Sequence, residues 1–274
     1  MDVTACTTVV SRWEKLDNCL QALFSGNQQP DEVIVLDNSN TPGANPVLEK
    51  HDVSVIEVEE KIGPSEARKR LSDSVETPLT LFIDADVSAN SQALERLHSR
   101  LTNTEYSVAA GIWSDYNKFY RRVGNSLHFD PVERNVIKKP ISYGDVQDFE
   151  TVEVEFSTPQ VMLETQVLDQ VGFDPEYRFY FEWWDFFMQL REIEEPILTV
   201  LDAEFIHEPG GYKGNESTRH DNYDPKIDQQ YFEEKWGYTP KTLDIEDGTY
   251  SKSQLKRRAS HYLKLLDVAQ KRKL

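Results

Sequence analysis

Two aspartates separated by one residue, Asp84 and Asp86, carry the most informative chemistry in the sequence. They follow the apolar run Leu79–Ile83, which has the length and composition of a buried strand. In an extended backbone, side chains at i and i+2 lie on the same side, so the two carboxylates are neighbours and repel each other. A divalent cation relieves this repulsion and keeps positions for phosphate oxygens. The pattern therefore predicts a metal-assisted site for a nucleotide diphosphate, although a D-x-D in so acidic a chain also occurs in solvated loops.

Three further residues stand where they could contact the same ligand. Asp37 follows the apolar run Glu32–Leu36 and could accept a hydrogen bond from a base N–H or from ribose hydroxyls; its structural alternative is a helix N-cap or turn aspartate. Gly63 would let a backbone approach closely, and Arg68 could reach a phosphate. The alternative for Arg68 is a solvated basic face of a helix.

The elements that must position these residues alternate in type along the first hundred residues. Strand-like runs at Thr4–Val10, Glu32–Leu36, Val53–Ile56 and Leu79–Ile83 are separated by segments with helical spacing, among them 13–24 and one that opens near Pro64. Such alternation predicts an α/β fold whose parallel sheet has right-handed crossovers. Ligands of these sheets bind at the carboxyl ends of the strands, where the candidate residues lie.

Four segments at these strand ends resemble those of one enzyme family. The segments are Thr7–Arg12, Val33–Ser39, Gly63–Arg70 and Asp84–Asp86. In that order they resemble family 2 glycosyltransferases of the GT-A fold, which bind nucleotide-diphospho-sugars, and the resemblance extends from about residue 4 to about residue 237. It implies a Rossmann-like, mostly parallel sheet with flanking helices.

The resemblance also implies a role for individual residues. Those expected to contact the nucleotide sugar are Thr8, Val10, Arg12, Asp37, Gly63, Arg68, Asp84 and Ala85. Asp37 is expected to contact uracil and Asp84 the ribose, while Asp86 is expected to bind Mn²⁺ or Mg²⁺. His207, which ends a strand-like run before a Gly-rich loop, is expected to join Asp86 on the metal, since imidazole suits Mn²⁺ better than Mg²⁺.

In the second half, Phe179–Arg191 resembles the E-D-x-D-x-x-x-R helix start of the family. Alignment on its final Leu-Arg pair places Asp185 at the catalytic base and puts Trp184 and Phe187 in place of two acidic neighbours. A carboxylate among aromatic residues has a raised pKa through desolvation, which suits a base near neutral pH. A slip in the alignment would give the role to Glu182, and the structural alternative is a helix N-cap.

The activity implied by the resemblance is an inverting, metal-dependent transfer of a sugar from UDP-hexose or UDP-hexuronic acid to a glycan, with Asp185 as the base. With the acidic composition, it points to a dolichol-phosphate-linked oligosaccharide in protein N-glycosylation as acceptor. A nucleotidyltransferase is disfavoured because Thr8–Trp13 lacks a G-x-G-x-R loop. A non-catalytic sugar-nucleotide or protein-binding module stays open. Gly210–Asp224 is expected to act as a lid, and Phe232–Gly237 to anchor the fold.

The composition restricts the class of protein. The chain has 274 residues, of which 38% are hydrophobic and 11% aromatic, as in a folded globular protein. A net charge of −18 argues against a nucleic-acid partner and favours a halophilic, haloarchaeal source. Two cysteines, Cys6 and Cys19, are too few for a disulfide framework and are expected to be buried. No signal peptide or membrane span is evident, so a cytoplasmic protein is expected.

The C-terminal segment 252–274 has the opposite charge to the rest of the chain. Eight basic residues and one acidic residue give it +7 and leave −25 on the preceding residues. Its apolar residues have helical spacing, so it predicts a basic amphipathic helix that contacts the inner face of the membrane or packs on protein. We expect a GT-A domain at 1–240, with nucleotide-binding half 1–110 and acceptor half 111–240, followed by a basic helical tail at 241–274.

Overall fold

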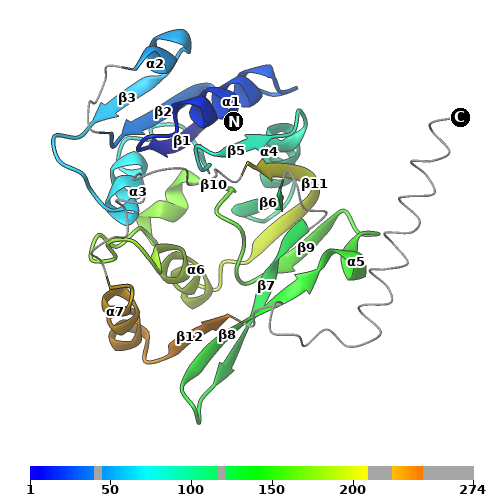
Figure 1. Ribbon diagram of the computed structural model, residues 1–274. Helices are drawn as coiled ribbons and strands as arrows, with labels where there is room; N and C mark the ends of the chain where they lie inside the picture. The colour runs from blue at the N-terminus through cyan, green and yellow to red at the C-terminus, as the bar shows by residue number, and fades with distance from the viewer. Residues whose placement is uncertain (40–44, 116–120, 209–223, 243–274) are drawn as a thin grey trace, which may run out of the picture. The chain divides into compact units, whose positions relative to one another are not determined.

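The computed structural model describes residues 1–39, 45–115, 121–208 and 224–242 (Figure 1). Within it, Met1–Lys241 forms one compact unit. The predicted lid, apart from Asp224, and the basic segment 252–274 lie outside the described residues, so their expected structures stay predictions.

The strands and helices alternate in the first half of the chain. The strands are β1 (Val3–Val9), β2 (Glu32–Asp37), β3 (Ser54–Glu57), β4 (Leu79–Phe82), β5 (Val87–Ala89), β6 (Val108–Asp115), β7 (Arg121–Asp130), β8 (Asn135–Ser142), β9 (Thr151–Val154), β10 (Val161–Glu164), β11 (Ile197–His207) and β12 (Thr239–Thr242). The helices are α1 (Trp13–Ser25), α2 (Pro46–Lys50), α3 (Pro64–Ser72), α4 (Ala93–Asn103), α5 (Tyr143–Val146), α6 (Glu182–Glu192) and α7 (Lys226–Trp236), with a 3₁₀-helix at Thr165–Asp169.

A mostly parallel sheet forms the centre of the fold. Its main path runs β12-β8-β7-β6-β10-β4-β1-β2-β3. Strands β4, β1, β2 and β3 pair in parallel, as the strand-helix alternation predicts. The next strand, β10, is antiparallel to both β4 and β6, so β6 returns to the direction of β4, and β11 pairs in parallel with β6. The α/β prediction with a mostly parallel sheet and flanking helices is confirmed.

Helices cover both faces of this sheet, which explains why its strands β2 and β4 are largely apolar. Alternate residues of β2 belong to different hydrophobic clusters: Val33 and Val35 pack with α1 and α4, whereas Ile34 and Leu36 pack with α3 and α6. A strand buried on both sides has no polar face, so its polar chemistry lies at its ends.

The second half adds an antiparallel extension that the sequence pattern did not predict. Strands β7 and β8 form a hairpin that continues the sheet beyond β6 and stands out from the rest of the fold in Figure 1. Near it, β9 pairs antiparallel with β11. Antiparallel β5 pairs with the last residues of β11, so the segment just after Asp86 runs beside His207.

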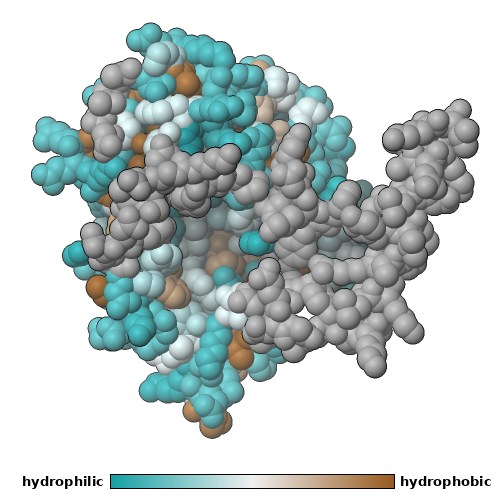
Figure 2. All heavy atoms as spheres, in the orientation of Figure 1, coloured by the Kyte–Doolittle hydropathy of each residue, from teal (hydrophilic) through white to brown (hydrophobic). Residues whose placement is uncertain are grey.

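The remaining expectations for the described part concern burial and surface. Cys6 and Cys19 are buried free thiols, as predicted, and burial raises the pKa of both. The face in Figure 2 is mostly hydrophilic where residues are described. Over the same residues, the model has no helix long and apolar enough to cross a bilayer.

Candidate active site

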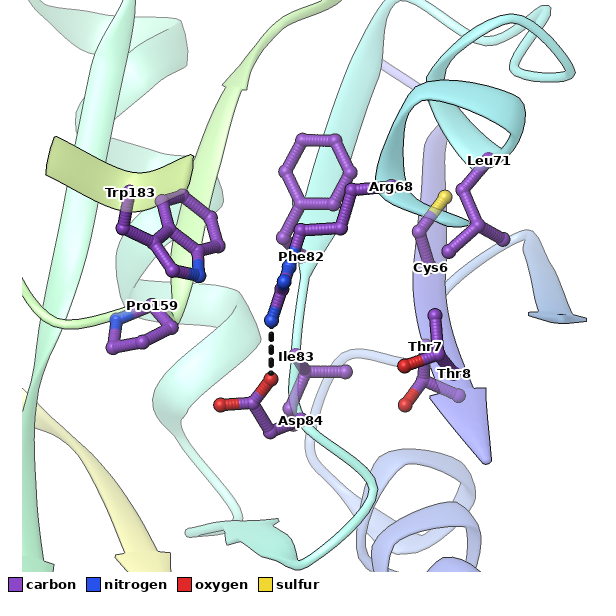
Figure 3. A pocket seen from close by; sticks show the side chains of 10 residues that line it. All are labelled: Cys6, Thr7, Thr8, Arg68, Leu71, Phe82, Ile83, Asp84, Pro159 and Trp183. Atoms are coloured by element: carbon purple, nitrogen blue, oxygen red, sulfur yellow. Dashed lines mark hydrogen bonds and ion pairs between the residues drawn. The ribbon is translucent and has the colours of Figure 1, made fainter. Parts of the chain in front are cut away.

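A pocket opens between the carboxyl ends of β1 and β4, the helix α3 and the first turn of α6 (Figure 3). Three of the predicted nucleotide-contacting residues, Thr8, Arg68 and Asp84, line it. Trp183 lines the opposite side from Thr8, with Arg68 and Asp84 between them. The rest of the lining is mainly apolar, and a concave apolar wall with a few convergent polar groups is the usual character of a ligand site.

Arg68 joins the two halves of the chain at this pocket. Its guanidinium donates to Oδ1 of Asp84 and to Oε1 of Glu182, both at 3.0 Å. It also lies over the Trp183 ring, with Cζ 5.0 Å from the ring centroid. Burial raises the pKa of Glu182, although the positive charge of Arg68 opposes the rise. Glu182 therefore has a higher proton affinity than an exposed glutamate, as a general base requires.

The predicted metal ligands Asp86 and His207 meet on a neighbouring part of the same edge. Nε2 of His207 lies 3.5 Å from Oδ2 of Asp86, and Arg12 donates to the same oxygen. Burial alone would raise the pKa of Asp86, but the hydrogen bond and charge of His207 and the charge of Arg12 hold it below its usual range. Asp86 is therefore ionised at neutral pH, as a metal ligand must be.

The pairing of β11 with β5 and β6 explains why these distant residues converge. His207 is opposite Val87 in the β5 ladder, one residue after Asp86, and its ring packs edge-on against Trp113 of β6 at 4.8 Å. Among the residues that the model describes, no group of three or more His, Cys, Asp or Glu side chains is arranged to hold a metal ion. Further ligands of a metal held by this pair would therefore come from the substrate, from water or from residues outside that part.

Asp37 and Gly63 lie at the carboxyl end of β2 and at the start of α3. Asp37 is fully buried at the end of β2, opposite Val9, and accepts the backbone N–H of Ser39 at 2.9 Å. Gly63 caps α3, and a Cβ there would clash with the backbone carbonyl of Arg178. A glycine is thus required at this position for packing against the loop that holds Arg178, independently of any contact with a ligand. Val10 and Ala85 follow β1 and β4 and are partly buried.

Asp185, predicted to be the catalytic base, lies in a closed hydrogen-bond network. Its side chain is fully buried and does not line the pocket. It accepts hydrogen bonds from four donors: Tyr177 Oη at 3.2 Å, Trp236 Nε1 at 2.8 Å, Gln189 Nε2 at 2.7 Å and Lys235 Nζ at 3.1 Å. Burial raises its pKa, and the hydrogen bond from Lys235 opposes the rise.

The loop that leads into α6 is held by α7. Asp228, fully buried in α7, accepts the backbone N–H groups of Arg178, Phe179 and Tyr180 at 2.8 to 3.2 Å. The next residue, Phe181, has a left-handed backbone with φ of 67°, which is costly for a residue with a Cβ. Such strain persists only where the surroundings enforce it, and here it sets the point from which Glu182 starts the helix.

Sequence patterns missed two residues at the pocket, Gln160 and Trp183. Gln160 donates to Oδ2 of Asp84 at 3.5 Å from just before β10, a strand that the pattern did not reveal. Trp183 stood beside the aligned aromatic residues, but periodicity alone does not tell which of two adjacent tryptophans faces a site. The feature of the sequence that could have identified Trp183 is its position one residue after Glu182, at the start of a helix.

Solved structures show the same fold at low sequence identity. The crystal structure of GalNAc-T7 with UDP, GalNAc and Mn²⁺ matches with a TM-score of 0.66 and 13% identity over 84% of this chain and 47% of that one. The crystal structure of S. aureus TarS 1–349 matches with a TM-score of 0.57 and 16% identity over 76% of this chain and 60% of that one. A structure of TarS of which this chain covers 37% matches equally well. This chain thus spans between 37% and 60% of the structures it resembles.

Sequence comparison identifies the family. No curated protein sequence matches the chain. Residues 4–163 match the family model described as Glycosyl transferase family 2. The matched range holds Thr8, Arg68 and Asp86, whereas Glu182 and His207 lie beyond it. Because the match covers more than half of the chain and the fold agrees, the chain belongs to glycosyl transferase family 2.

Proposed function

We propose that this protein is a metal-dependent glycosyltransferase that moves a sugar from a UDP-sugar to a glycan with inversion at the anomeric carbon. The observation that carries the proposal is the convergence of Asp86 and His207, 3.5 Å apart, beside a pocket lined by Arg68 and Asp84. A carboxylate and an imidazole that meet next to a pocket with an arginine suit a substrate with a diphosphate, because they can hold a divalent cation.

The donor set fits a divalent cation. One carboxylate and one neutral imidazole favour Mn²⁺ over Mg²⁺, which prefers oxygen ligands alone. Two protein ligands leave coordination positions for diphosphate oxygens. A cation bound there would offset the negative charge that develops on the leaving diphosphate. The presence of UDP and Mn²⁺ in the GalNAc-T7 crystal structure supports this choice of nucleotide and metal.

For the nucleotide, we propose that Asp37 recognises the base and Asp84 the ribose. Thr8, Val10, Gly63 and Ala85 would supply the surface on which the nucleotide lies. Arg12 would help to neutralise the diphosphate, because it already lies against the carboxylate of Asp86. These roles follow the family pattern.

We assign the role of base to Glu182 rather than to Asp185. A base must present a lone pair to the acceptor hydroxyl. Four donors occupy the carboxylate of Asp185, whose side chain is fully buried, whereas the Glu182 side chain is 12% exposed and adjoins the pocket through Arg68. In this assignment Glu182 takes the hydroxyl proton while the acceptor oxygen attacks the anomeric carbon. The bond from that carbon to the diphosphate breaks, and its electron pair leaves with UDP.

Charge and sequence pattern support a setting for the reaction. We propose a haloarchaeal source, on the strength of the net charge of −18, and a donor that is a UDP-hexose or UDP-hexuronic acid. The basic segment 252–274 would hold the protein at the inner face of an anionic membrane, where a dolichol-phosphate-linked glycan of N-glycosylation could be presented. In this proposal, residues 1–240 form the catalytic domain and residues 241–274 form the basic tail.

Thermal unfolding with a panel of nucleotide sugars tests the function. We expect UDP-sugars to raise the melting temperature in Mn²⁺, and Asp86→Ala or a chelator to remove most of the effect. Slow release of UDP in the absence of acceptor would identify an enzyme. Stabilisation without any release, even with glycan acceptors, would favour a non-catalytic binding module, and no stabilisation by any nucleotide sugar would overturn the proposal.

A further inference from the structure

Two lining residues of the pocket carry a buried polar atom without a partner among the described residues, Thr7 through its hydroxyl and Trp183 through its indole nitrogen. The indole nitrogen Nε1 of Trp183 is buried and makes no hydrogen bond with the described residues. The residue as a whole is only 9% exposed, so water has little access to its N–H. Buried tryptophan N–H groups normally find a partner, and an unpaired one is costly. In Figure 3 this nitrogen lies on the side of the ring that faces Arg68 and Asp84.

The ring that carries this N–H is firmly positioned. It stacks on Phe187 with centroids 5.4 Å apart and packs edge-on against Phe173 at 5.1 Å and Phe82 at 6.2 Å. Arg68 covers another part of the ring. With so many contacts, the ring cannot turn to find another acceptor, and the N–H keeps its direction toward the pocket.

A further unpartnered atom lies by the same carboxylate. Gln160 is fully buried and donates through Nε2 to Asp84, while its Oε1 has no partner among the described residues. Besides the hydroxyl of Thr7, which can donate or accept, the pocket region therefore offers an unused donor on Trp183 and an unused acceptor on Gln160. A hydroxyl group can accept from Trp183 and donate to Gln160.

We infer that Trp183 determines specificity in the donor-sugar subsite, where its N–H donates to one hydroxyl of the transferred sugar. This inference rests on the proposed function. Trp183 is adjacent in sequence to Glu182, the proposed base, so a sugar held by its N–H lies near the group that activates the acceptor. A site that hydrogen-bonds a substrate hydroxyl rejects the analogue that lacks it, because the buried polar group is left unpaired.

The test compares two substitutions of adjacent tryptophans in α6. Trp183→Phe keeps a packed ring and removes the N–H. Trp184→Phe is the matched control, because its ring packs on Phe156 and Phe232 and does not line the pocket. Dissociation constants are measured by calorimetry in Mn²⁺ for UDP, for the best-bound of UDP-glucose, UDP-galactose, UDP-N-acetylglucosamine and UDP-glucuronic acid, and for monodeoxy analogues of that donor.

In the unsubstituted protein and in Trp184→Phe, we expect one deoxy analogue to bind about five- to tenfold more weakly than the full donor, as for the loss of one hydrogen bond. In Trp183→Phe, that difference should disappear, while the affinity for UDP changes less than about twofold. Circular dichroism checks that each variant is folded. If Trp183→Phe folds poorly, the inference is still tested, because the deoxy analogues are also measured on the unsubstituted protein.

Four results would overturn the inference. The sugar could add no affinity over UDP, or no deoxy analogue could bind more weakly than the full donor. Trp183→Phe could keep the discrimination between the donor and its deoxy analogue. Finally, Trp183→Phe could lose affinity equally for UDP, which would place the N–H at the nucleotide. Failure of the unsubstituted protein to bind UDP or any UDP-sugar is a different result, and it would overturn the proposed function itself.

Discussion

Replacement of Asp185 by Asn is expected to destabilise the fold rather than to abolish the chemistry. All four groups around this carboxylate act as donors: Tyr177 and Trp236 to Oδ1, Gln189 to Oδ2, and Lys235 between the two, 2.9 Å from Oδ1 and 3.1 Å from Oδ2. An asparagine keeps one oxygen and brings an NH₂ group. Whichever way the amide turns, its NH₂ faces at least two of these donors.

The neighbours have little freedom to adapt. Tyr177 can turn its hydroxyl to accept, but the indole of Trp236 cannot. Gln189 is fixed because its amide pairs with both backbone groups of Gly172, at 2.8 and 3.0 Å. At least one buried donor therefore loses its partner, which costs about 1–3 kcal/mol. Lys235 loses one of its two carboxylates but keeps Asp174 at 2.8 Å, so the total is about 2–4 kcal/mol.

Thermal unfolding measures the predicted loss of stability, and UDP release measures whether the chemistry is retained. A loss of this size lowers the melting temperature by about 5–15 °C in a domain of this length. At a temperature where the variant is folded, we expect UDP release from a UDP-sugar within about tenfold of the parent rate. Glu182→Gln, the same exchange of carboxylate for amide in the same helix, is the control: its amide oxygen can still accept from Arg68, so we expect a smaller loss of melting temperature than in Asp185→Asn, together with lost release. An unchanged melting temperature with no UDP release in Asp185→Asn would refute this reasoning and make Asp185 the base.

Three further predictions follow from the described contacts. Because burial raises the pKa of Glu182 and a base must be ionised, the rate of UDP release should fall on acidification at a pH above the usual glutamate range. Arg68→Met removes the charge that opposes this rise and should move the acidic side of the pH–rate profile to higher pH. A profile that does not move would contradict the interaction of Arg68 with Glu182. Gly63→Ala should cost about 1–3 kcal/mol of stability, as overpacking does, whereas Gly172→Ala, which meets no atom within 4 Å, should be nearly neutral by denaturant titration. Hydrogen bonds from basic partners in and after α2 hold the pKa of Asp17 at about 2, so its stabilising effect should be lost as pH falls from about 4 to about 2; acid titration of Asp17→Asn should lack that component.

The strand-helix alternation of the first half was predictable because each buried strand is short, apolar and ends in polar residues. β2 and β4 begin where the pattern placed them, at Glu32 and Leu79, and each ends within one residue of the prediction. The β7–β8 hairpin was missed because its mixed polar and apolar sequence lacks a clear period, and antiparallel β10 was missed because its apolar run is only three residues long.

Long-range contacts decide the rest of the site. The meeting of Arg68 with Glu182 and of Asp86 with His207 depends on the docking of the second half on the first, which no local pattern encodes. Family resemblance supplied His207 as a partner for Asp86. It did not show that Asp185 would be enclosed by α7, since the residues that enclose it come from α7 and from the loop before α6.

The most direct test of the proposed chemistry is the rate of UDP release from the best-bound UDP-sugar in Mn²⁺ by Glu182→Gln, measured beside its affinity for UDP. We predict a rate lower by about 10²–10⁴, as for removal of a general base, with UDP affinity within about threefold of the parent. A parent-like rate in Glu182→Gln would contradict the assignment of the base, and a rate that persists in chelator would contradict the metal site at Asp86 and His207.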